Sequence, residues 1–185
     1  MSTPAASETD WVVLVDQLDR EVGVAGKLAA HLAPGRLHRA FSVFLFRADG
    51  SLLLQRRATT KYHFAGRWSN SCCGHPRPGE DVISAAIRRT SEELGLHCEL
   101  TPAGSMIYRA VDDATGLVEN EFDHVLLGVT DAAPAPAPEE ICDVSYAQPR
   151  LVDRMLRRDP HGYTPWLAEA LTIVLTRHVN HTRSH

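Results

Sequence analysis

The sequence predicts a single domain of the α/β or α+β class, built on a central mixed β-sheet with flanking helices. Short apolar runs separated by turn residues fill residues 10–57 and 105–129, as expected for strands. One segment between these regions and two near the C-terminus have helical periodicity. A chain of 185 residues can bury one sizeable core, so we expect residues 1–185 to form one domain, with short flexible ends at about 1–9 and 179–185.

Strands are expected first. The run DWVVLVD, residues 10–16, predicts a strand, followed by a turn through Gly23 and Gly26 and then a short helical turn or loop in GKLAAHLAPG. Residues 38–47 and 51–57 are apolar runs on either side of Ala-Asp-Gly, which is typical of a hairpin. The two adjacent cysteines at 72 and 73 then end a short extended segment that leads into a helix.

The strongest helical pattern is GEDVISAAIRRTSEELGL, residues 79–96. Gly95 is placed to end this helix in a left-handed conformation. The apolar stripe at helical spacing consists of Ile83, Ala86, Ile87, Thr90 and Leu94.

The second half of the chain predicts three more strands and two helices. Strand-like runs at 105–111 and 117–129 are joined by the turn DDATG, and a further strand is expected at 141–147. The Ala/Pro-rich segment 131–140 is too short and too closely flanked by apolar runs to separate two domains. Helices are expected at 150–158 and 165–179.

Composition and charge limit the function classes. Apolar residues make up 44% and charged residues 23% of the chain, which are ordinary globular values. A net charge of -4 argues against broad electrostatic binding of nucleic acid, although a local basic pocket for a small anion is compatible with it. No apolar run is long enough to cross a bilayer and the first ten residues lack the features of a secretion signal, so we expect a cytoplasmic protein without nucleic-acid or membrane partners.

Two charged pairs lie four residues apart on the predicted helix. Arg88 and Glu92 fall on its polar side, where a solvated ion pair is the ordinary interpretation. Arg89 and Glu93 fall at the margin of the buried stripe, where each charge needs a partner.

Three carboxylates, Glu119, Glu121 and Asp123, alternate along one predicted strand and therefore share one face. Carboxylates this close repel one another unless the face is open to water or a cation lies among them. An exposed acidic face is favoured over a metal or acid–base site, and the residues alone leave both interpretations open.

Cysteines and histidines give weaker signals. Four cysteines in a chain of this length do not indicate a disulfide framework, so free thiols are expected. Cys72 and Cys73 are either small buried hydrophobes or a pair of which one faces a cavity, because neighbours on an extended chain point to opposite sides. His31, His38 and His75 with nearby carboxylates would suit Mn²⁺, Fe²⁺ or Zn²⁺, with Mg²⁺ favoured as oxygen ligands increase.

Residues 74–96, GHPRPGEDVISAAIRRTSEELGL, resemble the Nudix box. Its fixed positions are matched by Gly74, Glu80, Arg88, Glu92, Glu93, Gly95 and Leu96. The sequence departs from the box at Arg89, where Nudix hydrolases carry a metal-binding glutamate, and at Thr90, where they carry an apolar residue. This departure disfavours ordinary diphosphate hydrolysis.

Arg89 and five further segments together resemble the sequences of the type I isopentenyl-diphosphate isomerases, which have a Nudix-type fold. The segments are WSNSCCGHP, AAHLAPGRLHRAFSVFLF, LLLQRRATTK, YRAVDDATGLVENEFDHVL and TPW, and the match spans about residues 10–170. The resemblance implies an isomerase that interconverts isopentenyl and dimethylallyl diphosphate through a tertiary carbocation, in isoprenoid biosynthesis. We therefore expect a small prenyl diphosphate substrate, a monomer and no flavin.

The resemblance also implies roles for individual residues. Cys73 and Glu121 would transfer protons on opposite faces of the alkene, with Tyr108 close to Glu121 and the Trp166 ring near the carbocation. A divalent metal, Mn²⁺, Mg²⁺ or Zn²⁺, would bind His31, His38, His75, Glu119 and Glu121. A second Mg²⁺, carried in with the diphosphate, would bind Glu93 and the Cys73 carbonyl. Lys27, Arg57, Lys61 and Arg89 would contact the diphosphate. The alternatives are a Nudix diphosphate hydrolase and a catalytically silent Nudix-like protein that binds a metabolite.

Overall fold

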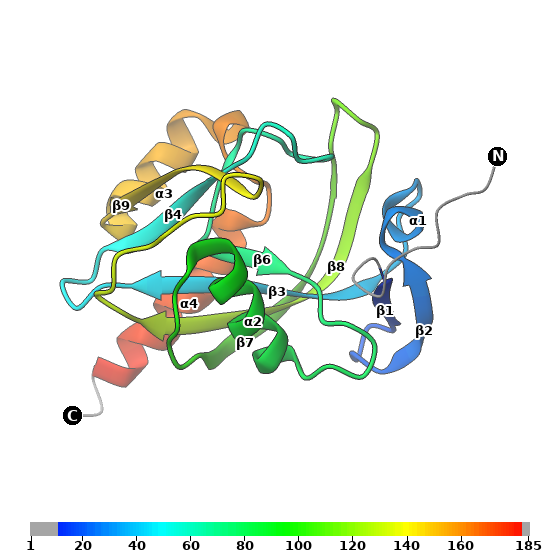
Figure 1. Cartoon of the computed structure of the whole chain (residues 1–185), viewed down its shortest axis with the longest axis horizontal. Coiled ribbons are helices and arrows are strands. Elements are labelled where there is room, and N and C mark those ends of the chain that lie inside the picture. The colour runs from blue at the N-terminus through cyan, green and yellow to red at the C-terminus, as the bar shows by residue number, and fades with distance from the viewer. Residues whose placement is uncertain (1–10, 183–185) are drawn as a thin grey trace.

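The computed structural model describes the backbone of residues 11–182 and the side chains of residues 11–177 (Figure 1). The expected flexible segment 1–9 and the last residues of the expected tail lie outside this range. The strands are β1 (Trp11–Val15), β2 (Glu21–Gly26), β3 (His38–Phe46), β4 (Leu52–Arg57), β5 (Trp68–Ser69), β6 (Cys72–Gly74), β7 (Thr101–Val111), β8 (Val118–Val129) and β9 (Ile141–Ala147). The helices are α1 (Lys27–His31), α2 (Val82–Leu94), α3 (Pro149–Arg158), a 3₁₀ turn at Pro160–Gly162 and α4 (Leu167–Thr182).

The strands form the predicted mixed sheet. A path β2-β1-β3-β4-β5 runs through it, and β9 extends it by pairing with β4. Strand β8 pairs in parallel with β3 and antiparallel with β7, while the short β6 pairs with the opposite side of β3. Strand β3 therefore lies at the centre of the fold and pairs with four other strands, β1, β4, β6 and β8.

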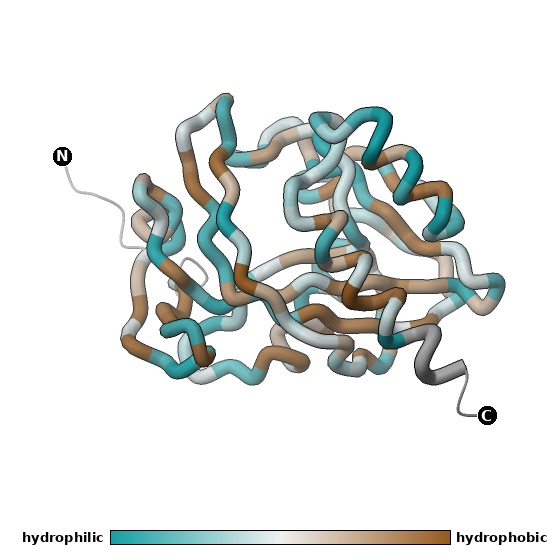
Figure 2. Tube along the Cα trace, turned by 180° about the vertical axis from the view of Figure 1, so that it is seen from behind, coloured by the Kyte–Doolittle hydropathy of each residue, from teal (hydrophilic) through white to brown (hydrophobic). Residues whose placement is uncertain are grey.

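Helices cover both faces of this sheet, as Figure 1 shows for α2 in front and α4 behind. Side chains along β3 alternate between the two faces of the sheet and so contribute to both hydrophobic clusters. Phe41 and Val43 pack in the cluster under α2, whereas Phe44 and Phe46 pack in the cluster with α4. Seen from behind in Figure 2, hydrophobic segments concentrate in the central strands and hydrophilic ones in the outer turns and helices. None of the described helices is both long and apolar enough to span a membrane.

Helix α2 ends at Gly95 as the sequence predicts and begins at Val82, inside the predicted pattern 79–96. Asp81 is its N-cap and accepts a hydrogen bond from Ser84 N at 2.9 Å, and Gly95 ends it with φ 63°. The predicted stripe is wrong at Ile87, which is 37% exposed, because the buried face is rotated toward Ala85 and Glu93.

Two further expectations differ from the structure. The chain does not turn at Gly23 and Gly26 but forms strand β2 there, paired with β1. The turn comes earlier, where the Asp16 side chain accepts hydrogen bonds from the backbone N–H groups of Leu18 and Arg20. Helix α4 starts at Leu167 and continues through Thr182, later at both ends than expected.

The connector 131–140 has no regular structure but packs on the end of α2. Ala135 N donates to Leu94 O at 2.7 Å and Ala137 N donates to Glu93 O at 2.9 Å. These bonds satisfy carbonyls that a helix C-terminus leaves without partners. The connector then brings Glu140 to Arg89 on the same helix.

We expect Gly95→Ala to destabilise the protein more than Gly116→Ala. Both glycines have positive φ, 63° and 73°, so each alanine costs about 1–2 kcal/mol of backbone strain. A Cβ at Gly95 would also lie 3.2 Å from the Ala135 Cβ, whereas nothing lies within 4 Å at Gly116. Urea unfolding of the two variants measures the difference, and equal losses would show that the connector yields freely at this contact.

Candidate active site and metal centre

Strand register brings the chemically important residues together. In the parallel β3–β8 pair His38 is opposite Glu121, and in the β7–β8 pair Tyr108 is opposite Glu121. In the β3–β6 pair Ser42 is opposite Cys73. Residues that lie far apart in the sequence therefore become neighbours across four adjacent strands.

Three histidines and two glutamates form one cluster in which the candidate ligand atoms lie within 4.8 Å of one another: His31, His38, His75, Glu119 and Glu121. His75 Nε2 is 2.8 Å from Glu121 Oε1 and 3.1 Å from His38 Nε2. His31 Nε2 lies 3.0 Å from Glu119 Oε2. This group of imidazoles and carboxylates is able to bind a divalent metal.

The orientation of the rings fits a metal. His31 Nδ1 and His38 Nδ1 donate to the backbone carbonyls of Lys27 and Arg36 at 2.7 and 2.8 Å, which leaves each Nε2 as a lone pair aimed at the cluster. Although only 3.0 Å apart, His31 Nε2 and Glu119 Oε2 have no well-aligned hydrogen-bond partner among the described residues. Two buried lone pairs without donors are what a cation would satisfy.

Electrostatics favour the metal-binding form at His75 and Glu121, whereas at His31 the neighbouring Glu119 outweighs burial and raises the pKa. Burial lowers the pKa of His75 to about 3, so this imidazole is neutral at physiological pH. Burial alone would raise the pKa of Glu121, but the neighbouring imidazoles of His38 and His75 hold it well below its ordinary value. Neutral imidazoles and ionised carboxylates are the metal-binding forms.

The two adjacent cysteines face opposite sides, as the extended geometry predicts. Cys72 is fully buried in the cluster under α2, whereas Cys73 packs on the other side of the sheet and borders the main cavity. The Cys73 thiol donates to Asn70 Oδ1 at 3.0 Å. Burial and the nearby charge of Asp123 raise the pKa of Cys73 to about 12, so the sulfur holds its proton.

An aromatic wall stands beside this thiol. Trp166, 4% exposed, contacts Tyr108 with ring centroids 5.7 Å apart and Phe64 with centroids 5.5 Å apart. The Tyr108 hydroxyl donates to Glu121 Oε2. Burial and the charge of Glu121 raise the pKa of Tyr108 well above its ordinary value, so it is a donor toward that carboxylate.

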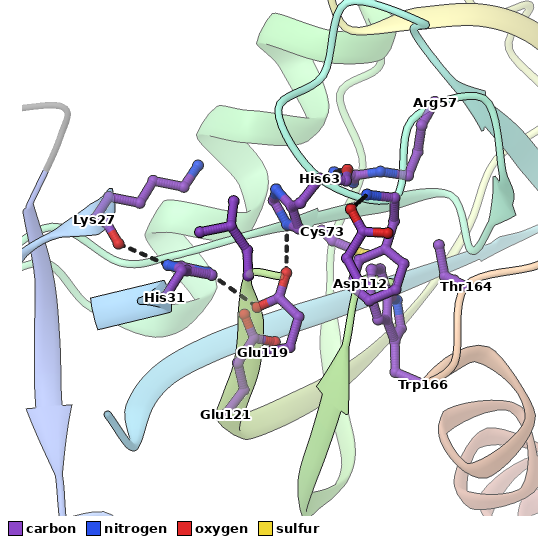
Figure 3. Close-up of polar contacts among 12 residues, drawn as sticks. Lys27, His31, Arg57, His63, Cys73, Asp112, Glu119, Glu121, Thr164 and Trp166 are labelled. Carbon is purple, nitrogen blue, oxygen red and sulfur yellow. Dashed lines mark hydrogen bonds and ion pairs between the residues drawn. The ribbon is translucent and has the colours of Figure 1, made fainter. Parts of the chain in front are cut away.

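The cavity between these groups measures about 410 Å³, the size of a small-molecule site. Its lining includes almost all residues that the resemblance implicates: Lys27, Arg57, Lys61, Cys73, His75, Arg89, Glu93, Tyr108, Glu119, Glu121 and Trp166. His31 and His38 are completely buried and belong to the metal-ligand cluster. The structure thus brings every predicted site residue into one region, part of which Figure 3 shows.

One part of the cavity wall is strongly charged. Arg89 donates to Glu92 at 2.7 Å, to Glu93 and, at 3.0 Å, to Glu140. Lys61 also forms an ion pair with Glu140. Burial lowers the pKa of Lys61 to about 8. The expectation that Arg89 and Glu93 need partners at the buried margin of α2 is therefore confirmed.

Two site residues escaped the sequence analysis. Glu140 lies in a connector with no motif, and only the path of that connector brings it to Arg89 and Lys61. His63 is 6% exposed and its Nε2 contacts Glu119 Oε1, so Glu119 lies between His31 and His63 (Figure 3). No local spacing marks His63, because its loop lies between β4 and β5, away from the other histidines in sequence.

Comparisons with known proteins agree with this geometry. The model of the NUDIX domain family matches residues 36–169. An isopentenyl-diphosphate Delta-isomerase from Nocardia farcinica is 51% identical over 162 residues, covering 88% of this chain and 93% of the relative. Isopentenyl-diphosphate Delta-isomerase 1 of Aromatoleum aromaticum is 46% identical over 175 residues, covering 94% and 98%.

Solved structures show the same fold. The crystal structure of DR0079 from Deinococcus radiodurans superposes with a TM-score of 0.70 at 25% identity, covering 88% of this chain and 97% of that one. The MutT protein from Methanosarcina mazei gives a TM-score of 0.63 at 16% identity, covering 77% and 95%, and supports the fold alone.

We expect Co²⁺ added to the metal-free protein to produce a visible absorption spectrum and to raise its melting temperature, because an ion that binds only the folded state stabilises it. Glu119→Gln should weaken Co²⁺ binding by more than about tenfold, since it replaces a charged ligand by a neutral amide. Glu99→Gln, a change at an exposed carboxylate, is the control. Equal Co²⁺ affinity in the two variants would exclude Glu119 as a ligand.

Proposed function

The chain belongs to the Nudix family and, within it, to the isopentenyl-diphosphate Delta-isomerases, and on this basis we propose that it interconverts isopentenyl and dimethylallyl diphosphate. The observation that carries the proposal is the content of one cavity. A protonated thiol, Cys73, an ionised carboxylate, Glu121, and an aromatic ring, Trp166, line the same space as a group of cationic side chains.

Moving the double bond requires one proton to be added and another to be removed. In the forward direction, the Cys73 Sγ–H bond breaks and its proton joins the terminal methylene carbon of isopentenyl diphosphate, which leaves a tertiary carbocation and a thiolate. Glu121 then takes a proton from the adjacent CH₂, and those C–H electrons form the new double bond. The protonation states of Cys73 and Glu121 suit these roles, and Tyr108 supports the carboxylate by a hydrogen bond.

The carbocation has no hydrogen-bonding group of its own, so it must be stabilised by charge and by aromatic faces. Trp166 supplies an aromatic quadrupole, which contributes about 0.5–2 kcal/mol to a desolvated cation. The reaction transfers no electrons to or from the substrate, and none of the proposed proton-transfer steps uses a redox cofactor.

A divalent metal at the His/Glu cluster, which we propose to be Mn²⁺, Mg²⁺ or Zn²⁺, would fix the Glu121 carboxylate and hold down its proton affinity. His31, His38, His75 and Glu119 would complete its ligands. The cluster touches the cavity through His75, Glu119 and Glu121 alone, so the substrate meets the carboxylates rather than the two most deeply buried imidazoles.

The diphosphate does not react, and its binding energy orients the alkene. We propose that it lies against Lys27, Arg57, Lys61 and Arg89. Glu92, Glu93 and Glu140 already form ion pairs with two of these four cations, Lys61 and Arg89, so the polyanion gains by arriving with Mg²⁺. Glu93 and the Cys73 carbonyl are the proposed ligands of that ion.

Diphosphate hydrolysis is not favoured. Nudix hydrolases place a metal-binding glutamate where this chain has Arg89, and here the guanidinium binds the very carboxylates, Glu92 and Glu93, that a hydrolytic metal cluster would use. A cation in that position takes the place of one metal-binding carboxylate and attracts the substrate anion.

The test is NMR of isopentenyl diphosphate incubated with the protein and Mg²⁺ in D₂O. We expect deuterium in the methyl and methylene positions of substrate and product, and no release of phosphate. Absence of deuterium would refute isomerisation, and phosphate release would support the hydrolase alternative.

Cys73→Ala and Glu121→Gln should each lower turnover by about 10²–10⁴-fold, since each removes a proton-transfer group. Cys72→Ala is the matched control, because Cys72 is the adjacent thiol but lies on the opposite side of β6. The same assay, with circular dichroism to verify folding, compares the three variants. Comparable losses at the two cysteines would overturn the assignment of Cys73.

A further inference from the structure

Asn70 lies in the short loop between β5 and β6, is completely buried and does not border the main cavity. Its side chain nevertheless contacts two of the groups proposed to act on the substrate. Asn70 Oδ1 accepts hydrogen bonds from Cys73 Sγ and from Trp166 Nε1, both at 3.0 Å. One oxygen atom therefore joins the thiol on β6 to the indole at the start of α4.

The orientation of this amide follows from its neighbours. Asn70 Nδ2 lies 3.1 Å from Val43 O and 2.9 Å from Cys72 O, which are carbonyl oxygens and can only accept. The indole N–H of Trp166 can only donate, so the atom facing it must be the amide oxygen. The reversed amide would lose all of these bonds inside the core, at a high desolvation cost.

We propose that Asn70 is a positioning residue for isomerisation: its amide oxygen holds the Cys73 thiol and the Trp166 ring at a fixed separation, so that proton transfer and carbocation stabilisation occur at the same carbon atoms. This inference rests on the proposed function for its chemistry and on the hydrogen bonds alone for its geometry. Because β3 anchors the Nδ2 side, the oxygen is fixed to the centre of the sheet rather than to a mobile loop.

The surroundings of the oxygen also suit a thiol that loses its proton during the reaction. Ser69 Oγ donates to Asn70 Oδ1 at 2.9 Å and lies 3.9 Å from Cys73 Sγ. Ser42 Oγ, opposite Cys73 on β3, lies 3.8 Å from the same sulfur. Three donors share the two lone pairs of Oδ1, so the Ser69 hydroxyl can turn to a thiolate while Asn70 keeps Trp166 in place.

Two variants separate positioning from simple structural support. Asn70→Leu has a similar volume but removes the oxygen, and Asn70→Asp keeps an acceptor for Cys73 and Trp166 while losing both amide donors. Ser71→Ala is the control, because Ser71 is the next residue, is equally buried and directs its hydroxyl to Leu45 N and Leu53 O rather than to Cys73 or Trp166. All three variants should lose stability.

In steady-state kinetics with isopentenyl diphosphate and Mg²⁺, we expect Asn70→Leu to lower kcat by about 10²-fold, since a displacement of about 1 Å at reacting groups costs that much. KM should change less than threefold, because the cationic residues are untouched. Asn70→Asp should retain at least tenfold more kcat than Asn70→Leu, and Ser71→Ala should stay within threefold of the unmodified protein. If kcat simply follows the melting temperature across the three variants, or if both Asn70 variants are equally impaired, the proposal is overturned.

A second measurement does not depend on activity. In protein labelled with ¹⁵N-tryptophan, the indole N–H signal of Trp166, assigned from Trp166→Phe, should shift in Asn70→Leu while those of Trp11 and Trp68 stay in place. An unshifted Trp166 signal would overturn the proposed geometry even if the protein is an active isomerase. Failure of the deuterium assay with the unmodified protein, by contrast, would count against the proposed function and leave the indole result to decide the role of Asn70.

Discussion

The burial of two ionised carboxylates two residues apart on β8 is the constraint on which the rest of the site depends. Glu119 and Glu121 are 2% and 7% exposed, and such a concentration of negative charge is not stable in a core without positive or hydrogen-bonding partners. The fold meets this demand with histidines from α1, β3, the β4–β5 loop and the β6–α2 loop. Asp123, next on the same face, shifts in the opposite direction from Glu121, since burial and the charge of Glu121 raise its pKa well above the ordinary value. The metal-binding capacity of the cluster and the ionised state of Glu121, the proposed proton acceptor, therefore both follow from the burial of these carboxylates.

Around Arg89 and Lys61, the part of the cavity away from the His/Glu cluster, it is positive charge that has to be compensated. Positive side chains gather there, and their repulsion is relieved by acids from α2 and from the connector. Arg89 is the clearest case: in the position of a Nudix glutamate it makes ion pairs that hold Glu93 and Glu140 together. The change from a metal ligand to an anion ligand is thus accompanied by a compensating acid from a segment outside the Nudix box.

Much of the fold could be predicted because local signals agreed with the tertiary structure. The hairpin of β3 and β4, the ends of α2 and the whole of β9 follow from apolar periodicity, capping residues and a single glycine. The facing directions of Cys72 and Cys73 follow from strand geometry alone. Local patterns could not decide which faces are buried. Alternation placed Glu119 and Glu121 on one face, but only the parallel pairing with β3 shows that this face is buried. Glu140 and His63 could not be found at all, since their contacts depend on the paths of irregular segments through space.

The environment of Cys73 also has a bearing on the chemical durability of the protein. Oxidants and electrophiles attack thiolates, and a sulfur whose pKa is raised to about 12 presents very little thiolate in its resting state. Cys72 is fully buried and points to the opposite side of the strand, so it is poorly placed to form a disulfide with its neighbour. Cys142 is exposed and lies away from the cavity lining. Mild oxidative stress should therefore modify the surface thiol of Cys142 first and spare Cys73, the proposed proton donor.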